Sequence, residues 1–297
     1  MPGLKEVRLR IASVISTQQI TKAMKMVSAA KLRRAQDAIQ RLRPYASKLT
    51  EIMQNVSQSS EVSGGNAFTA VRPVNKVLIV AIASNRGLCG AFNSNIIRTT
   101  NRMIREQYSQ QNAAGNVKVL CIGKKVSDYF AKNKKLYLDN RNDVYNHLDF
   151  EHASEIAAFL MDEFAKETFD KVVIVYNRFK NAAVQYVTEE TLMPLQPSAE
   201  EQPAGKGATT KADYIFEPSI EEIVNELIPK TIRTQLYKAL LDSHASEHGA
   251  RMTAMNKATD NAGEMLRDLR LSYNKARQAV ITREILEIVG GAEALKG

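Results

Sequence analysis

The chain has 297 residues, of which 44% are hydrophobic and 25% are charged, close to the values of ordinary globular proteins and unlike those of disordered or collagen-like chains. Its longest purely apolar run, residues 77–83, has 7 residues, far short of the about 20 that cross a bilayer, which excludes an integral membrane protein. The net charge of +9 is concentrated in residues 1–60, which hold 11 Lys and Arg against 3 Asp and Glu, and such a basic segment indicates an acidic partner.

Residues from about Leu4 to Ser57 are predicted to form one long helix, because good helix formers dominate and no glycine occurs between Gly3 and Gly64. Apolar residues recur at alternating steps of three and four, the pattern of a coiled-coil seam. The seam positions are Leu4, Val7, Ile11 and Val14, then Leu32, Ala35, Ile39, Leu42, Ala46, Leu49, Met53 and Val56. We expect Pro44 to kink the helix or break its bonding locally.

In the middle of this helix the same frame falls on polar residues, while the apolar residues move to other faces. The polar seam positions are Gln18, Thr21, Lys25 and Ser28, and the displaced apolar residues are Ile20, Ala23, Met24, Met26, Val27 and Ala30. A helix that is apolar away from its seam is expected to contact something besides its coiled-coil mate.

After a linker at residues 62–73, residues 74–195 alternate strand and helix patterns. The expected strands are 76–84, 117–123, 135–139 and 171–177, with a half-exposed edge strand at 182–192; the expected helices are 94–108, 124–132 and 150–167. We expect Asn93 to cap the first of these helices. This alternation predicts a Rossmann-like, mainly parallel α/β domain.

Residues 196–213 are polar and rich in Pro and Gly, which predicts a flexible loop. Residues 214–297 again read as one long helix, with Pro218 in its first turn and Pro229 inside it. A second series with steps of three and four comprises Met252, Met255, Thr259, Ala262, Leu266, Leu269, Tyr273, Ala276 and Val280. The sequence therefore predicts a long antiparallel coiled coil of the N-terminal (1–60) and C-terminal helices, with the α/β domain inserted between them.

Three features are candidate functional sites, and each also has a purely structural interpretation: the loop 84–93, the two cysteines and the segment 244–248. The loop SNRGLCGAFN (84–93) joins a strand to a helix, where Rossmann-like folds bind phosphate, but Gly87 and Gly90 form neither a dinucleotide nor a P-loop fingerprint. A tight turn is favoured, with Arg86 placed to meet an acidic partner. Cys89 and Cys121 lie at the end of one strand loop and within another strand, so we expect them to be buried as small apolar groups. A redox pair would need the two cysteines close in space.

The segment HASEH (244–248) matches an H-x-x-E-H zinc-protease pattern. His244 and His248 lie one helical turn apart and could share a metal, with Glu247 as a base. No spacing singles out a third ligand, and a coiled-coil helix offers no substrate cleft. Packed or solvated histidines are therefore favoured, and we expect no metal site and no cofactor.

The basic stripe of the N-terminal helix leaves three readings open: nucleic-acid binding, an acidic protein partner, or a solvated face. Its members are Lys22, Lys25, Lys31, Arg33, Arg34, Arg41 and Arg43. Aromatic residues are almost absent, and neither a zinc finger nor an RNA-stacking motif occurs. A coiled-coil nucleic-acid-binding protein is the alternative function.

Three long stretches resemble the gamma subunit of the F-type ATP synthase: IASVISTQQITKAMKMVSAAKLRRAQ (11–36), SNRGLCGAFN (84–93) and residues 250–295, beginning ARMTAMNKATDNAGEM. The chain begins at Met1 without an Arg-rich transit peptide or an apolar signal segment, so we expect a bacterial form at the cytoplasmic face of the inner membrane. The loop at 197–213 is longer than the family's core pattern requires, and the regulatory cysteine segment of the plastid form is not recognisable.

The resemblance implies a non-catalytic rotor shaft that turns inside a ring of alpha and beta subunits and contacts the epsilon subunit and the membrane ring of c subunits. It implies peripheral attachment to the membrane through the complex and no nucleic-acid partner. It also implies that the beta subunit is contacted by Met24, Lys25, Arg86, Arg277 and Gln278.

Overall fold

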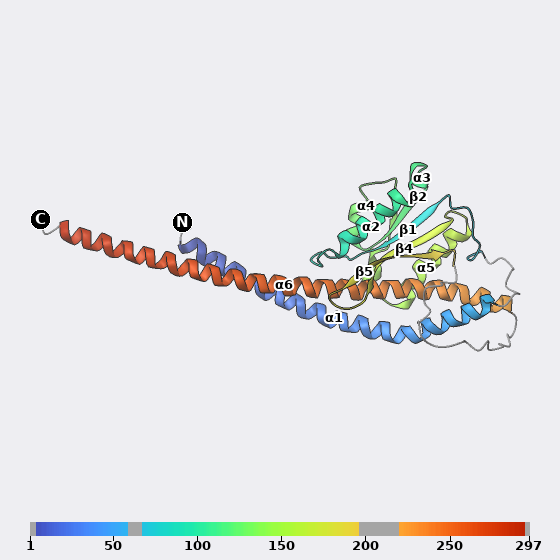
Figure 1. The fold of residues 1–297 in the computed structure, drawn as a ribbon, viewed down its shortest axis with the longest axis horizontal. Helices are drawn as coiled ribbons and strands as arrows, with labels where there is room; N and C mark the ends of the chain where they lie inside the picture. Colours follow the sequence, from blue (N-terminus) through green and yellow to red (C-terminus); the bar gives the residue numbers. More distant parts are fainter. Residues whose placement is uncertain (1–3, 59–66, 196–219, 295–297) are drawn as a thin grey trace. The chain divides into compact units, whose positions relative to one another are not determined.

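The computed structural model describes residues 4–58, 67–195 and 220–294. It divides into two compact units: residues 1–29 with 251–297 form the coil unit, and residues 30–250 form the α/β unit. Two long helices, α1 (Leu4–Gln58) and α6 (Ile220–Ala294), contribute residues to both units (Figure 1). The linker residues 62–66 and the loop 196–213 expected from the sequence lie outside the described residues.

Both predicted long helices are present. From Leu4 to Leu49 in α1 and from Met252 to Ala276 in α6, the series with steps of three and four marks buried or half-buried positions, including those occupied by polar residues, whereas its last member, Val280, is exposed. Pro44 lies inside α1 and Pro229 inside α6, and each helix continues through its proline although that residue donates no backbone hydrogen bond.

The α/β unit contains one five-stranded sheet of order β3-β2-β1-β4-β5. Its strands are β1 (Val77–Ile82), β2 (Val117–Ile122), β3 (Tyr137–Asn140), β4 (Lys171–Phe179) and β5 (Gln185–Met193). The first four strands pair in parallel, and β5 closes one edge antiparallel to β4. The predicted mainly parallel α/β fold with an edge strand is confirmed.

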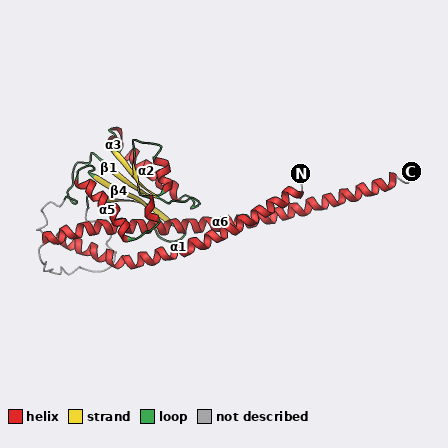
Figure 2. Ribbon diagram, turned by 180° about the vertical axis from the view of Figure 1, so that it is seen from behind, coloured by secondary structure: helices red, strands yellow, loops and turns green. Residues whose placement is uncertain are grey.

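The connections between these strands carry α2 (Phe92–Glu106), α3 (Ser109–Ala113), α4 (Lys124–Phe130), the 3₁₀ turn η1 (Asn142–Tyr145) and α5 (Phe150–Ala165). Figure 2 shows these helices in red beside the yellow strands. Asn93 does not cap α2, because the helix begins one residue earlier, at Phe92. Its side-chain oxygen instead accepts hydrogen bonds from the amide and the hydroxyl of Ser84 at 3.0 and 2.9 Å.

The alternating side chains of the central strands feed two hydrophobic clusters, one on each face of the sheet. On one face, Leu78, Val80 and Ile82 pack with α5 and with residues 228–240 of α6. On the other face, Val77, Ile79 and Ala81 pack with residues of α2 and α4. The C-terminal helix is therefore part of the core of the α/β unit, and not only half of a coiled coil.

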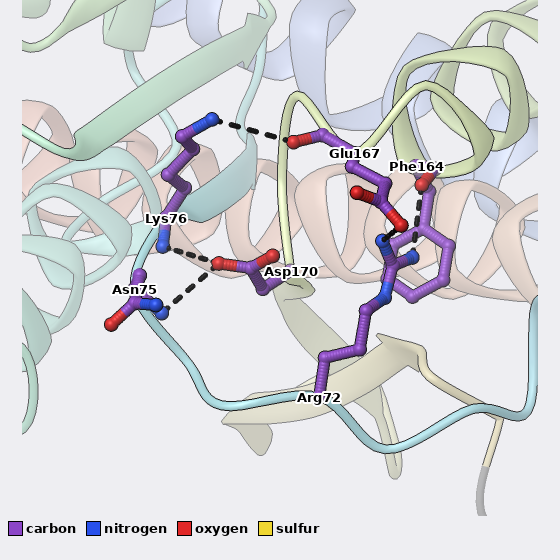
Figure 3. Close-up of polar contacts among 6 residues, drawn as sticks. All are labelled: Arg72, Asn75, Lys76, Phe164, Glu167 and Asp170. Carbon is purple, nitrogen blue, oxygen red and sulfur yellow. Dashed lines mark hydrogen bonds and ion pairs between the residues drawn. The ribbon is translucent and has the colours of Figure 1, made fainter.

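The segment before β1 is anchored beside the start of β4 (Figure 3). The carboxylate of Asp170 accepts the backbone N–H groups of Asn75 and Lys76 at 3.0 and 2.8 Å. Arg72 donates to the carbonyl oxygen of Phe164 at 3.0 Å, pairs with Glu167 at 3.2 Å and lies 4.6 Å from the centre of the Phe164 ring. These contacts fix the chain where it enters the sheet.

Both cysteines are buried, as the sequence predicts. Burial, with a smaller contribution from the carboxylate of Asp139, raises the pKa of the Cys121 thiol to about 12. Its reactive thiolate form is therefore scarce at neutral pH.

Candidate functional site

The coil unit pairs the N-terminal part of α1 with the C-terminal part of α6 in antiparallel order. Arg8 donates a hydrogen bond to the Tyr273 hydroxyl at 3.1 Å. Further along α1, Lys25 donates to the side-chain oxygen of Asn256. As the residue number rises along one helix it falls along the other, which confirms the predicted antiparallel pairing.

The polar stretch of the seam is held by hydrogen bonds rather than by apolar contact. The Thr259 hydroxyl donates to the Thr21 hydroxyl at 2.8 Å, and Thr21 donates in turn to the carbonyl oxygen of Gln18 at 3.0 Å. Ser28 is buried and donates to the carbonyl oxygen of Met24 at 2.8 Å. The bonds from Thr259 to Thr21 and from Lys25 to Asn256 join the two helices, so a shifted pairing would lose both, and the polar layer favours one register of the coiled coil.

Apolar side chains displaced from this layer face solvent. Ile20, Met26 and Val27 are 57%, 67% and 58% exposed. On α6, Met265 and Leu271 are also exposed. Exposed apolar residues are typical of surfaces that other proteins cover, so these residues are candidate partner contacts of the coil unit.

The C-terminal end of α6 is a second candidate surface. Arg8 pairs with Tyr273, so the helix beyond about residue 277 runs past Leu4, the first described residue of α1. Every described residue from 277 to 294 is exposed, including Val280, Ile281, Ile285, Leu286, Ile288 and Val289. At 100° per residue these six span about 240° of the helix circumference. A helix apolar over that much of its surface is suited to a surrounding partner.

Sequence reasoning did not identify this terminal surface. Its signal is the cluster of aliphatic residues between 280 and 289 that follows no single helical face. Such a pattern departs from the one-sided stripe of an ordinary two-helix coil.

The five residues that the family resemblance assigns to a beta-subunit contact lie in three places. Met24 and Lys25 are half-buried on α1, whereas Arg277 and Gln278 are exposed on α6. Lys25 is bonded to Asn256, and Arg277 lies 21 residues beyond Asn256 along α6, about 32 Å away at 1.5 Å per residue. Arg86 is exposed in the α/β unit. The coil unit therefore does not gather its four residues into one site.

The other members of the basic stripe, Lys22, Lys31, Arg33, Arg34, Arg41 and Arg43, are exposed, while Lys25 turns into the seam. The exposed members place positive charge where an acidic partner could approach. Only Lys25 among them is also part of the coiled-coil contact.

The loop 84–93 is a tight turn whose polar groups bond to one another. Leu88 and Gly90 have positive φ angles of 64° and 59°, and the Ser84 hydroxyl donates to the carbonyl oxygen of Arg86 at 2.6 Å. Asn93 donates to the sulfur of Cys89 at 3.2 Å. The turn is thus held by its own side chains and leaves Leu88, 65% exposed, at the surface.

Two asparagines tie this turn to the neighbouring loops at the carboxyl edge of the sheet. Asn85 donates to the carbonyl oxygen of Asn142 and accepts from the backbone N–H of Lys124, at 3.1 and 2.9 Å. Asn142 also accepts the backbone N–H of Gly123 at 2.9 Å. Gly123 has φ +110°, and a Cβ atom there would lie 2.2 Å from the carbonyl oxygen of Ala83, so only glycine fits.

The two histidines of the HASEH segment lie together on α6. Their Nε2 atoms are 3.1 Å apart, and the rings are perpendicular with centroids separated by 4.5 Å. Across residues 4–58, 67–195 and 220–294, no three His, Cys, Asp or Glu side chains cluster so as to hold a metal ion.

A buried polar cluster joins β4 and β5 to α6. Glu190 accepts hydrogen bonds from the Tyr176 hydroxyl at 2.9 Å and from the Gln235 amide at 2.5 Å. Nearby Asp242 is only 8% exposed. Burial raises its pKa to about 6; Glu190 adds to the rise, whereas Lys238, Arg178 and Arg43 oppose it.

Comparison with known proteins places the chain among rotary ATPase subunits. A family model described as ATP synthase matches residues 3–295. The ATP synthase gamma chain of Flavobacterium johnsoniae is 56% identical over the whole of both chains, and that of Cytophaga hutchinsonii is 52% identical over 99% of each.

Solved structures give the same fold. The central stalk and c-ring structure of the Tetrahymena thermophila mitochondrial ATP synthase contains a chain that matches with a TM-score of 0.58 at 26% identity, covering 80% of this chain and 99% of that one. A chain of the Euglena gracilis mitochondrial ATP synthase matches with a TM-score of 0.64 at 24% identity, covering 98% and 94%. The second likeness concerns the fold alone.

Proposed function

The chain belongs to the gamma-chain family of ATP synthases, and we propose that it transmits rotation from a proton-driven membrane ring to the catalytic sites of the beta subunits. It is the gamma subunit of an F-type ATP synthase, the central stalk of the rotor, and a subunit of the complex rather than its catalytic chain. The observation that carries the proposal is the full-length match to gamma chains, together with a coil unit that exposes several large apolar side chains.

The seam supports a role in transmitting torque. A helix pair whose register is fixed by the bonds of Thr21, Thr259, Lys25 and Asn256 resists sliding of one helix along the other. The two helices also expose different residues, so the coil presents a different surface in each direction. Rotation of such a surface inside the ring would bring each beta subunit in turn against a different face.

The terminal part of α6 supports an enclosing contact. Its exposed aliphatic residues occupy about two thirds of the helix circumference, which fits a collar formed by several alpha and beta subunits better than a single flat partner. The exposed side chains of Arg277 and Gln278 stand at the start of this segment and are proposed to contact a beta subunit.

Met24 and Lys25 are proposed to face a beta subunit from α1. The ammonium group of Lys25 is bonded to Asn256 across the half-buried seam, so its charge is held in one position. A carboxylate of the beta subunit would then meet a cation of fixed position. Arg86, exposed on the turn of the α/β unit, is proposed to make a separate acidic contact.

The remaining contacts are proposed from the family resemblance. We place the epsilon subunit and the c ring against this unit, and the whole complex at the cytoplasmic face of a bacterial inner membrane. None of the helices in the described ranges combines the length and apolarity needed to cross a bilayer. We propose that the chain associates with the membrane through the complex, as its gamma-chain family implies.

Co-purification tests the proposal. The tagged chain would be recovered from gently solubilised membranes of its own cell, its partners identified, and Mg-ATPase activity measured. Recovery of alpha, beta and epsilon subunits with activity supports the rotor role. Recovery of the chain alone overturns it, and recovery with nucleic acid, in binding that falls steeply with salt, favours the alternative of a basic nucleic-acid-binding coil.

A further inference from the structure

A row of lysines marks the amino-terminal ends of the four parallel strands in the α/β unit. Each of these strands has a lysine immediately before it or within its first two residues, or a pair of lysines just ahead of it. These amino-edge lysines are Lys76 before β1, Lys118 in β2, Lys134 and Lys135 before β3, and Lys171 at the start of β4. We propose that the amino-edge lysines bind the anionic headgroups of a lipid bilayer surface.

The strand register places these lysines along one edge of the sheet. The strands β3, β2, β1 and β4 are neighbours in that order and run parallel, so their starts lie side by side. Lys171 is paired with Val77, the residue after Lys76. Lys118 is paired with Leu78, one residue further along β1. Since neighbouring strands are about 4.8 Å apart, the four strand starts spread the lysines over about 14 Å.

Acidic residues are scarce around this row. The four segments that lead into the parallel strands contain two acidic residues in all; these segments are 67–76, 107–116, 131–136 and 166–170. Both carboxylates already have partners (Figure 3). Glu167 pairs with Arg72 at 3.2 Å, and Asp170 accepts the backbone N–H groups of Asn75 and Lys76. The edge therefore carries an excess of positive charge.

The chain does not neutralise the amino-edge lysines with its own carboxylates. Across the part of the chain that the structure describes, no ion pair includes one of them, whereas nearby Lys166 pairs with Asp162. The Lys118 ammonium donates instead to a neutral group, the carbonyl oxygen of Lys135, at 2.8 Å. The charge of the row is thus available to an anionic partner.

The composition of the row favours a bilayer surface over an acidic protein. Protein–protein interfaces are enriched in arginine and depleted of lysine, and all five members are lysines. An ammonium group acts on phosphate as a compact point charge, without the fixed fork of arginine. Near an anionic leaflet each lysine strengthens binding by about fivefold. The inference rests on the proposed function for the place of the chain at a membrane, and it adds a direct lipid contact to attachment through the complex.

Sedimentation of the full chain with phosphatidylcholine vesicles, with and without phosphatidylglycerol, tests the proposal. The test variant removes the three exposed amino-edge lysines by Lys76→Gln, Lys134→Gln and Lys135→Gln. The matched control removes three exposed lysines that follow the carboxyl ends of β2 and β4, by Lys124→Gln, Lys125→Gln and Lys180→Gln. Both variants lose the same charge and keep the basic stripe of α1. On vesicles with phosphatidylglycerol the test variant should bind more than about thirtyfold more weakly than wild type, and the control less than about fivefold. Added salt should weaken wild-type binding.

A second readout uses the wild-type chain and does not depend on how the variants fold. Acetylation of each lysine by an anhydride, followed by mass spectrometry, should slow several-fold at Lys134 and Lys135 when vesicles with phosphatidylglycerol are present, and should not change at Lys124 and Lys125. Equal losses of affinity in the two variants, or unchanged acetylation at Lys134 and Lys135, would overturn the proposal. Protection that arises only on assembly with the other subunits in detergent would overturn it in favour of an acidic protein partner. Because vesicle binding is measured on the chain by itself, this proposal and the rotor role can fail separately.

Discussion

Replacing Asp242 by asparagine should stabilise the chain at alkaline pH and have little effect at acidic pH. Asp242 is buried, and its pKa is raised from 3.8 to about 6, mainly by burial. A rise of this kind means that folding disfavours the charged carboxylate. About two pKa units correspond to about 3 kcal/mol, so ionisation of Asp242 costs on that order at neutral pH.

The sign of the pH dependence follows directly. The protonated form is the one that folding accommodates, so its contribution is fully present below the unfolded pKa of 3.8 and is lost as pH rises through about 6. The asparagine variant is neutral at every pH and similar in size. Its free energy of unfolding should exceed that of wild type by up to about 3 kcal/mol at pH 8, with the difference approaching zero near pH 4.

Urea unfolding followed by far-ultraviolet circular dichroism at several pH values measures this difference, and comparison with wild type cancels the other titrating groups. The matched control is Asp149→Asn. Asp149 is exposed, and its pKa is lowered because its carboxylate accepts the backbone N–H of His152 at 2.9 Å. That control should lose stability at pH 8. An Asp242→Asn variant less stable than wild type at pH 8 would refute the reasoning, because Lys238 and Arg178 would then more than offset the burial.

Three further substitutions test the fold and the proposed partner contact. Gly123→Ala should destabilise the chain by about 4 kcal/mol in urea unfolding, since it combines a clash with backbone strain; Gly115→Ala, strained but unobstructed, should cost about half as much, and equal losses would contradict the clash. Leu266→Ala, at a buried position of the seam, should lower the free energy of unfolding by about 2–3 kcal/mol, and Leu271→Ala, at an exposed position, by less than about 0.5 kcal/mol. Equal melting temperatures of the two variants would contradict the assignment of Leu266 to the seam. Lys25→Glu should lower proton pumping per ATP hydrolysed, because it reverses the charge that is proposed to meet a carboxylate of the beta subunit. It should also cost about 1 kcal/mol of coil stability, because the Lys25 ammonium is bonded across the seam. Unaltered pumping would remove Lys25 from the beta contact.

The sequence predicts the long helices well because their information is local and repeated. The steps of three and four identify the seam even where it is polar, at Thr21 and Ser28, and the structure buries both residues. The parallel strands are equally legible as short apolar runs such as 77–82. In each case the pattern depends only on which face of an element is covered.

Features that depend on contacts between residues far apart in the chain could not be predicted from the sequence. Asn93 has the composition of a helix cap, but its side chain bonds to Ser84 across the turn, and the helix begins before it. The sequence likewise gave no sign that Ile232 and Leu236 of α6 complete the core under the sheet. Both outcomes depend on tertiary contacts, which override local preference.

Met24, Lys25, Arg86, Arg277 and Gln278 remain predictions as partner contacts. The structure locates these residues, and it adds that Lys25 has a second role in the seam. It also adds the apolar end of α6, which no motif marked. We expect surfaces that are covered only in a complex to be exposed and apolar in the single chain. Exposed aliphatic side chains are most numerous in α6 beyond residue 277.

The most direct test of the central claim is to watch the shaft turn. Lys132 is exposed in the α/β unit, and Cys89 and Cys121 are buried, so a Lys132→Cys variant offers a selective attachment point for a bead. With the alpha and beta subunits of the assembled complex fixed to a surface, addition of MgATP should make the bead rotate steadily in one direction. A bead that stays still while the same complexes hydrolyse ATP would contradict the account.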